Sequence, residues 1–183
     1  MIELSYPALD KNPLVYPQDG VNEKWASTLR YGTVIAEIQG HKLYQYKSPD
    51  LVNFAMQNKS NTKEIPFFMY GYLKSLNGHV VFEERLVWKQ EGFLPNYVAS
   101  LVVEFILPSV KSIVCSNEHT NRGRKLWFKI CELARSRGYS VYYLSWKENS
   151  IVIEKIKDLD KIPDLWEFKD ESSRFLISKV IKP

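Results

Sequence analysis

The chain has 183 residues and a formal net charge of +4, and 45% of its residues are hydrophobic and 25% charged. This length and balance indicate one globular domain, and they exclude two large domains, a disordered chain and a fibrous one. The longest apolar stretch, Val98 to Leu107, is interrupted by Ser100 and Glu104, so the sequence predicts no transmembrane helix. No basic, apolar leader precedes the first strands. We therefore expect a cytoplasmic protein that does not bind membranes.

Cysteine and histidine are scarce. Cys115 and Cys131 are too few for a disulfide framework, and with the three scattered histidines they show no metal-ligand spacing. We therefore expect neither a disulfide scaffold nor a bound metal ion.

The first half of the chain has the pattern of strands. Residues 1–30 contain three prolines and little periodicity, which predicts an extended N-terminal arm before a single domain over residues 31–183. A short helix is expected at Asp50 to Gln57. Two hairpins are predicted, one around Gln39-Gly40-His41 and one around Asn77-Gly78, the pair preferred in two-residue type I′ turns. Their strands are residues 33–38 with 42–46, and residues 67–76 with 79–88.

After Trp88 helices and strands alternate. The apolar run Tyr97 to Leu107 predicts a buried helix stopped by Pro108, and a second helix is expected from Thr120 to Arg137, ending at Gly138. Strands are expected at residues 111–116, 139–146 and 174–181, whereas 151–156 fits a helix or a strand. The predicted class is α/β: a mixed sheet with an antiparallel N-terminal meander, then β-α-β-α-β and a C-terminal strand pair. Strands 82–88 and 111–116 should be parallel neighbours, because the helix between them makes a crossover.

Three motifs lie between Phe82 and Trp127. An acid-containing strand, Phe82 to Trp88, leads through Gly92 into the buried helix. Ser116-Asn117-Glu118-His119 follows the next strand. The segment from Thr120 to Trp127 has polar, small, aliphatic and aromatic residues at fixed places: Thr120, Gly123, Leu126 and Trp127.

These motifs and the order of elements over residues 67–181 resemble the GNAT superfamily of N-acetyltransferases. The family's fourth strand leads into its cofactor helix, and its Asn-x-x-Ala-x-x-Leu-Tyr motif is similar to the segment 120–127. Ser116 to His119, with Gly123 and Trp127, is also similar to divergent GNAT-like proteins of bacteriophages, including the Mom type that modifies adenine in DNA.

The resemblance implies transfer of an acyl group from acetyl-CoA or another acyl-CoA to an amine on a small molecule, a protein or a DNA base. It assigns the cofactor to Lys89, Gly92, Tyr97, Asn117 and Thr120, although Thr120 is also a plausible helix N-cap. Two departures stand out. Leu94 occupies the second small position of the phosphate loop, and Trp127 replaces the tyrosine that commonly donates a proton, so an acid would have to come from elsewhere.

Acyl transfer needs a base that takes the proton of the amine. Strict alternation places Glu84 on one face with Phe82, Leu86 and Trp88, which would desolvate its carboxylate and raise its pKa. The alternative is a bulged strand in which Glu83 or Glu84 pairs with Arg85 or faces water. His119, between a strand and a helix, is the second catalytic candidate, and its alternative is an ordinary surface histidine.

The positive charge is concentrated on the second predicted helix. Residues 121–137 hold six basic side chains against Glu132 alone, a charge of +5, which leaves −1 for the rest of the chain. Arg122, Arg124 and Lys125 lie in the first turns, where the helix dipole disfavours cations, so we predict an anion site there. The alternatives are a solvated face, or a non-catalytic GNAT-fold protein that binds nucleic acid or an acidic partner through this helix.

Overall fold

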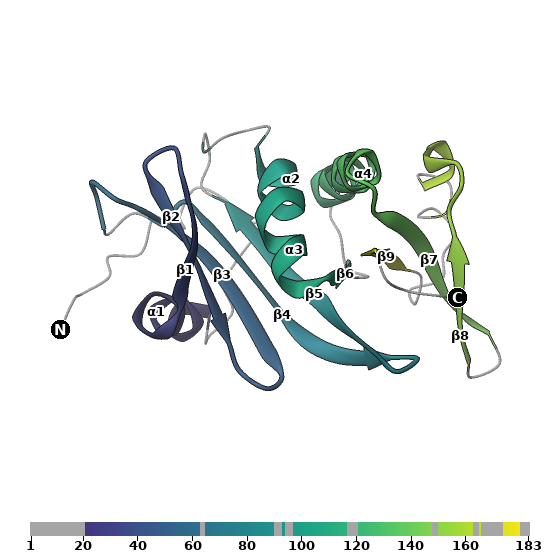
Figure 1. The fold of residues 1–183 in the computed structure, drawn as a ribbon, viewed down its shortest axis with the longest axis horizontal. Coiled ribbons are helices and arrows are strands. Elements are labelled where there is room, and N and C mark those ends of the chain that lie inside the picture. The colour runs from purple at the N-terminus through teal and green to yellow at the C-terminus, as the bar shows by residue number, and fades with distance from the viewer. Residues whose placement is uncertain are drawn as a thin grey trace. The chain divides into compact units, whose positions relative to one another are not determined.

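The computed structural model describes residues 21–62, 65–89, 93, 97–116, 121–147, 150–162, 165 and 174–179. These residues form an α/β fold with one mixed sheet of nine strands in the order β1-β2-β3-β4-β5-β6-β9-β7-β8 (Figure 1). The chain divides into two compact units. The first unit is Met1–Leu73 with Arg85–Phe93, and the second is Lys74–Glu84 with Leu94–Pro183.

The first unit holds the antiparallel meander that the sequence predicts. Successive strands from β1 to β4 pair antiparallel, and helix α1 packs against β2 and β3 (Figure 1). Strand β4 begins in the first unit and ends in the second, and β5 begins in the second unit and ends in the first. The bounds are α1 (Val21–Tyr31), β1 (Thr33–Ile38), β2 (His41–Lys47), β3 (Leu51–Asn58), β4 (Phe67–Leu76) and β5 (His79–Lys89).

Both predicted hairpin turns are confirmed. Gln39 and Gly40 have φ values of 47° and 79°, and Asn77 and Gly78 have 48° and 80°. A type I′ turn requires positive φ at both central residues, and asparagine and glycine tolerate it best. Local chemistry therefore sets the register of these two hairpins.

The prediction of an extended arm is wrong for residues 21–30, because α1 begins at Val21. The helix buries Trp25, whose ring lies 5.4 Å from that of Phe68 and 5.2 Å from that of Trp88. Thr28 and Leu29 follow at the spacing of one helix face, so contact with the sheet stabilises a helix whose own apolar pattern is short. The rest of the predicted arm lies outside the described residues.

The short helix predicted at Asp50 to Gln57 is also wrong: this segment forms β3. Residues Val52 to Met56 are all buried, so both faces of the strand are covered. A short continuous apolar run does not distinguish a strand from a buried helix, and here pairing with β2 and β4 decides.

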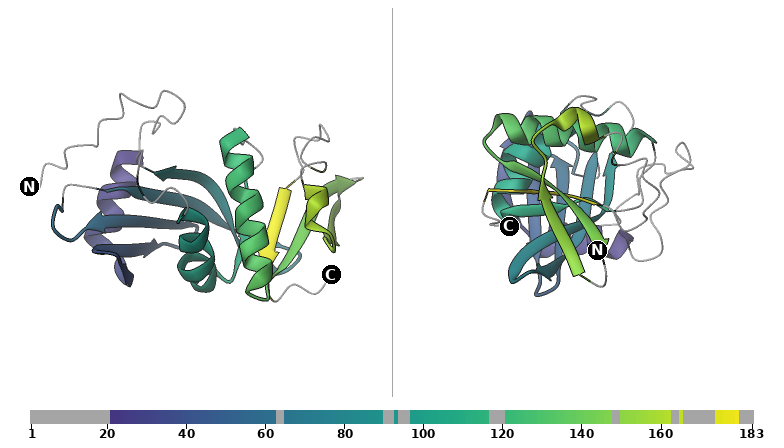
Figure 2. Two further views of the ribbon diagram at one scale, coloured as in Figure 1. Left: turned by 90° about the horizontal axis from the view of Figure 1, so that it is seen from above. Right: turned by 90° about the vertical axis from the view of Figure 1, so that its right-hand side faces the viewer.

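The second unit holds the alternating helices and strands. As predicted, β5 and β6 are parallel neighbours, with Phe82 opposite Ile113 and Glu83 opposite Val114. Strand β9 lies between β6 and β7, antiparallel to both, while α4 packs against β7 (Figure 2). Segment 151–156, whose sequence fits either a helix or a strand, belongs mostly to strand β8. The bounds are α2 (Val98–Leu101), η2 (Val102–Ile106), α3 (Leu107–Val110), β6 (Ser112–Val114), α4 (Asn121–Ser136), β7 (Ser140–Lys147), β8 (Ser150–Lys155), η3 (Leu159–Lys161) and β9 (Arg174–Ser178).

The buried helix does not stop at Pro108 as predicted. Segments α2, η2 and α3 are continuous from Val98 to Val110, and the middle segment is a π-helix that ends directly before Leu107 and Pro108. Proline clashes with the carbonyl four residues earlier in a regular α-helix, and the wider π turn relieves this crowding. Lys111, with φ of 68°, ends the helix instead. None of the helices in the described ranges has the length and apolarity that crossing a bilayer requires.

The middle of β5 is buried on both faces. Val81 to Glu84 are all buried, so a simple alternation of buried and exposed residues does not hold there. The two-residue turn at 77–78 puts Lys74 and Glu83 on one face, where their side chains pair. The shared face that the sequence predicts for Glu84 with Leu86 and Trp88 stays a prediction.

Candidate functional site

The carboxylate of Glu84 lies at the end of strand β6. Its side chain is only 3% exposed, and Oε2 accepts a hydrogen bond of 3.1 Å from the backbone N–H of Ser116, two residues beyond β6. The parallel pairing of β5 and β6 sets this contact, because Glu83 is opposite Val114 and the next residues of the two strands follow side by side. In open α/β sheets ligands bind beyond the carboxyl ends of the strands, which is where Glu84 lies relative to β6.

The adjacent acid, Glu83, has different partners. Its Oε2 lies 2.7 Å from Nζ of Lys74 and 3.1 Å from a guanidinium nitrogen of Arg174. Glu83 thus belongs to a three-membered ion network that includes β9. The contact given for Glu84 is the backbone N–H of Ser116.

Cys115, next to Ser116 in the chain, is a buried core residue and does not supply a nucleophile. Its thiol is buried, and its Sγ accepts a hydrogen bond of 3.1 Å from the N–H of Phe175. Burial, and secondarily the nearby Glu84 carboxylate, raises the pKa of the Cys115 thiol to about 12. A thiol with this pKa has almost no thiolate at neutral pH, which excludes nucleophilic attack by Cys115 there.

Four predicted site residues, Gly92, Asn117, His119 and Thr120, lie outside the described residues. Ser116, the hydrogen-bond partner of Glu84, directly precedes Asn117 in the chain.

Two other predicted cofactor residues are half-buried at the ends of elements. Lys89 is the last residue of β5, and its Nζ donates to the carbonyl of Phe93 at 3.4 Å. Tyr97 precedes α2 and accepts a backbone hydrogen bond of 2.8 Å from Leu101. Lys89 belongs to the first unit and Tyr97 to the second, so each is placed only within its own unit.

Helix α4 has one buried face. Trp127, Ile130 and Ala134 are fully or almost fully buried, whereas Arg124 and Lys125 are exposed. The Arg122 backbone belongs to the first turn of the helix, and its side chain lies outside what the structure describes. Because Trp127 belongs to the core, its place in the family motif is one of packing.

The two ends of the basic helix have different surroundings. Near its C-terminus, Arg137 pairs with Glu104 at 2.7 Å, and Arg135 donates to the carbonyl of Lys157. Within the described ranges no ion pair joins Arg124 or Lys125 to an acidic side chain. Arg124 and Lys125, in the first half of α4, are therefore available to a ligand, as is the exposed Lys129 further along the helix.

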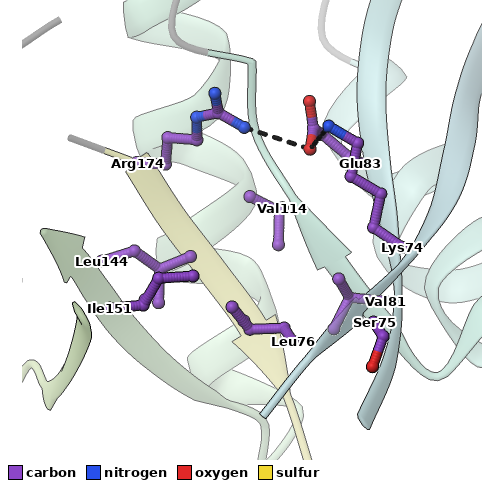
Figure 3. A pocket seen from close by; sticks show the side chains of 9 residues that line it. All are labelled: Lys74, Ser75, Leu76, Val81, Glu83, Val114, Leu144, Ile151 and Arg174. Carbon is purple, nitrogen blue, oxygen red and sulfur yellow. Dashed lines mark ion pairs between the residues drawn. The ribbon is translucent and has the colours of Figure 1, made fainter. Parts of the chain in front are cut away.

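Sequence reasoning missed a pocket in the second unit. Lys74, Glu83 and Arg174 lie at one end of it, and aliphatic side chains form its walls (Figure 3). Glu83 and Lys74 share a hairpin face, which alternation along the strands indicates. Arg174 comes from a strand far along the chain, and no local pattern connects it to Glu83.

Comparisons of the chain with protein families and with curated proteins find no match.

Proposed function

We propose that the protein is a GNAT-like acyltransferase that moves an acyl group from an acyl-CoA to an amine, with Glu84 as the general base. One observation carries the proposal: a buried carboxylate at the end of β6, bound to the N–H of Ser116. The order β5, helix, β6, α4, β7 supports it too, since the resemblance implies this order.

Glu84 has the chemistry that the reaction needs. An amine attacks a thioester only as the free base, so a carboxylate that takes its proton accelerates the step. The surrounding strand ends exclude water, which strengthens the electrostatic interactions of the carboxylate. The backbone N–H of Ser116 orients the carboxylate through a hydrogen bond.

The remaining roles stay with the residues that the resemblance assigns. Lys89, Gly92, Tyr97, Asn117 and Thr120 would hold the acyl-CoA, and His119 is the proposed second acid–base group. The burial of Trp127 fits the expectation that the leaving thiolate takes its proton from another group.

The variant Glu84→Gln tests this function. Glutamine keeps an oxygen that accepts the Ser116 hydrogen bond but cannot take a proton, so we expect acyl transfer to fall by about 100-fold or more with the melting temperature near wild type. Release of CoA from acetyl-CoA is measured with a panel of primary amines, a lysine-containing peptide and duplex DNA as acceptors.

Glu83→Gln is the matched control, because it changes the same group one residue away. It weakens the ion network with Lys74 and Arg174, so we expect a lower melting temperature and nearly unchanged turnover. Full turnover by Glu84→Gln excludes Glu84 as the base. If the wild-type protein shows no turnover with any of these acceptors, the proposed acyltransferase activity is contradicted.

The second candidate is a non-catalytic protein that binds nucleic acid or an acidic partner through α4. The exposed cations Arg124 and Lys125 favour it, because they lie in the first half of the helix without an ion pair among the described residues. Phosphates would relieve their conflict with the helix dipole.

A further inference from the structure

The pocket in the second unit has a volume of about 150 Å³ and walls that are mostly aliphatic. Leu76 and Val81 come from the β4–β5 hairpin, while Val114 comes from β6 and Leu144 and Ile151 from the β7–β8 hairpin (Figure 3). An apolar cavity of about this volume has room for a group the size of benzene, or about six carbon atoms. The walls therefore select a small apolar group.

The polar end of the pocket carries a net positive charge. Lys74 and Arg174 contribute +2 and Glu83 contributes −1, which gives +1 from the ionic side chains described at the pocket. The side chain of Glu83 is 5% exposed and that of Lys74 is 47% exposed, so the ammonium reaches solvent at the mouth. Its three N–H donors exceed the one bond that it makes to Glu83.

Burial of Glu83 and of most of Arg174 costs desolvation free energy, and a buried ion pair is in general no more stabilising than apolar residues of similar volume. The network fixes the orientation of two cations at the end of an apolar pocket, which is the arrangement that recognises a carboxylate on a hydrocarbon group.

We infer that this pocket binds a small apolar carboxylate, with its hydrocarbon group between Val81, Leu144 and Ile151 and its carboxylate on Lys74. Binding of an apolar amine is disfavoured, because Oε2 of Glu83 already forms ion pairs with Lys74 and Arg174. A hydrocarbon without charge would gain the apolar contacts only.

Hexanoate is the probe, and hexylammonium and hexanol are the charge controls. In protein with labelled isoleucine, leucine and valine methyl groups, hexanoate should shift the NMR signals of Val81, Val114, Leu144 and Ile151 in a saturable way, in about the millimolar range. The methyl signals of Leu43, which is buried in the first unit, should not move.

Lys74→Gln should weaken hexanoate binding by about fivefold and leave the weak binding of hexanol unchanged, since it removes one partly exposed charge. Lys155→Gln, an exposed lysine on β8 of the same unit, should change nothing. The melting temperature of each variant is measured to verify folding.

Three results overturn the inference: no methyl shift with hexanoate, shifts confined to other residues, or equal affinity for hexanoate, hexanol and hexylammonium. The titration on wild-type protein needs no variant, so a misfolded Lys74→Gln would leave the test intact. The inference is independent of acyl transfer, because neither the probe nor the readout involves acyl-CoA or Glu84.

Discussion

Glu83 and Glu84 are adjacent residues of the same chemistry with different surroundings. Both are almost fully buried, yet Glu83 meets two cations and Glu84 meets a backbone N–H. Glu83 is held in an ion network, and Glu84 accepts the N–H of Ser116 at the end of β6. Adjacent residues of one strand thus have different positions in the site, and the proposed base is the one at the end of β6.

Stability at alkaline pH should depend on Cys115. Its pKa is about 12 in the folded protein and near 9.0 in the unfolded chain, so folding is favoured fully below pH 9 and less as pH rises toward 12. In this window the free energy of unfolding should fall by about 1.4 kcal/mol per pH unit through this thiol. Urea unfolding of wild-type protein and Cys115→Ala at pH 7, 9 and 10 measures the difference between the two slopes.

Cys131 serves as the comparison, because burial raises the pKa of its thiol as well and Cys115→Ala leaves it in place. The variant should lose only part of the alkaline slope. Equal slopes in wild-type protein and Cys115→Ala would contradict a buried, protonated Cys115. Rapid modification of the native protein by a thiol reagent at pH 8 would contradict it as well.

At the scale of elements, short local signals predict turns and helix ends well. Gly138, two residues after the end of α4 at Ser136, has φ of 80°, as expected for a helix that ends in a left-handed residue. Predictions from local signals fail where the surrounding structure overrides the local preference. The π segment lets the helix continue through Pro108, and the sheet turns the apolar segment 51–58 into a strand.

The β4–β5 hairpin should lose stability when its turn glycine acquires a side chain. Gly78 has φ of 80°, a conformation that costs an L-residue about 1 to 2 kcal/mol, although a Cβ there would meet no atom within 4 Å. Gly78→Ala should therefore lower the free energy of unfolding by about 1 kcal/mol through backbone strain alone. Urea denaturation measures it.

Ser75→Ala, an exposed change in the same hairpin, is the matched control and should alter stability by less than about 0.5 kcal/mol. If Gly78→Ala is as stable as wild type, the turn does not hold a type I′ conformation in solution.

At the scale of the whole molecule, the small net charge of +4 is unevenly distributed. Residues 121–137, which are α4 and the residue after it, carry +5, and the rest of the chain carries −1. Side chains at the C-terminal end of the helix are tied to Glu104 and to a backbone carbonyl, whereas Arg124 and Lys125 in the first half are exposed. An anionic ligand should bind at the first half, and its affinity should depend on salt.

The triple variant Arg122→Glu, Arg124→Glu, Lys125→Glu tests this site. Binding of short duplex DNA, or of CoA, should weaken, and for DNA the slope of log affinity against log salt should decrease by about one unit per lost cation. Stability should change little, because each cation in the first turns opposes the dipole by about 0.3 to 1 kcal/mol. Affinity is measured by fluorescence anisotropy at several salt concentrations.

Arg137→Glu is the control, since this arginine pairs with Glu104 at the other end of the helix. It should leave the salt slope nearly unchanged. Competition by CoA for binding at the first half of α4 favours the acyltransferase function. A DNA affinity that falls steeply with salt favours the nucleic-acid-binding function. Identical binding by wild type and the triple variant means that α4 presents a solvated face.

The sequence by itself determined the features whose causes lie within a few residues of each other. These are the Asn77-Gly78 turn, the apolar face of α4 with its end at Gly138, and the order of strands and helices from β5 to β7. Turn conformation and helix periodicity depend on short-range sterics and on spacing along one element, which the residues themselves encode.

Only the tertiary structure decided which distant residues meet. Arg174 reaches Glu83 because β9 inserts between β6 and β7, and Ser116 reaches Glu84 because β6 runs parallel to β5. Such partners follow from strand order and register, and these depend on the burial of whole elements rather than on local preference. For the same reason, the sequence identified Glu84 as a candidate base but showed neither its hydrogen-bond partner nor the pocket beside Glu83.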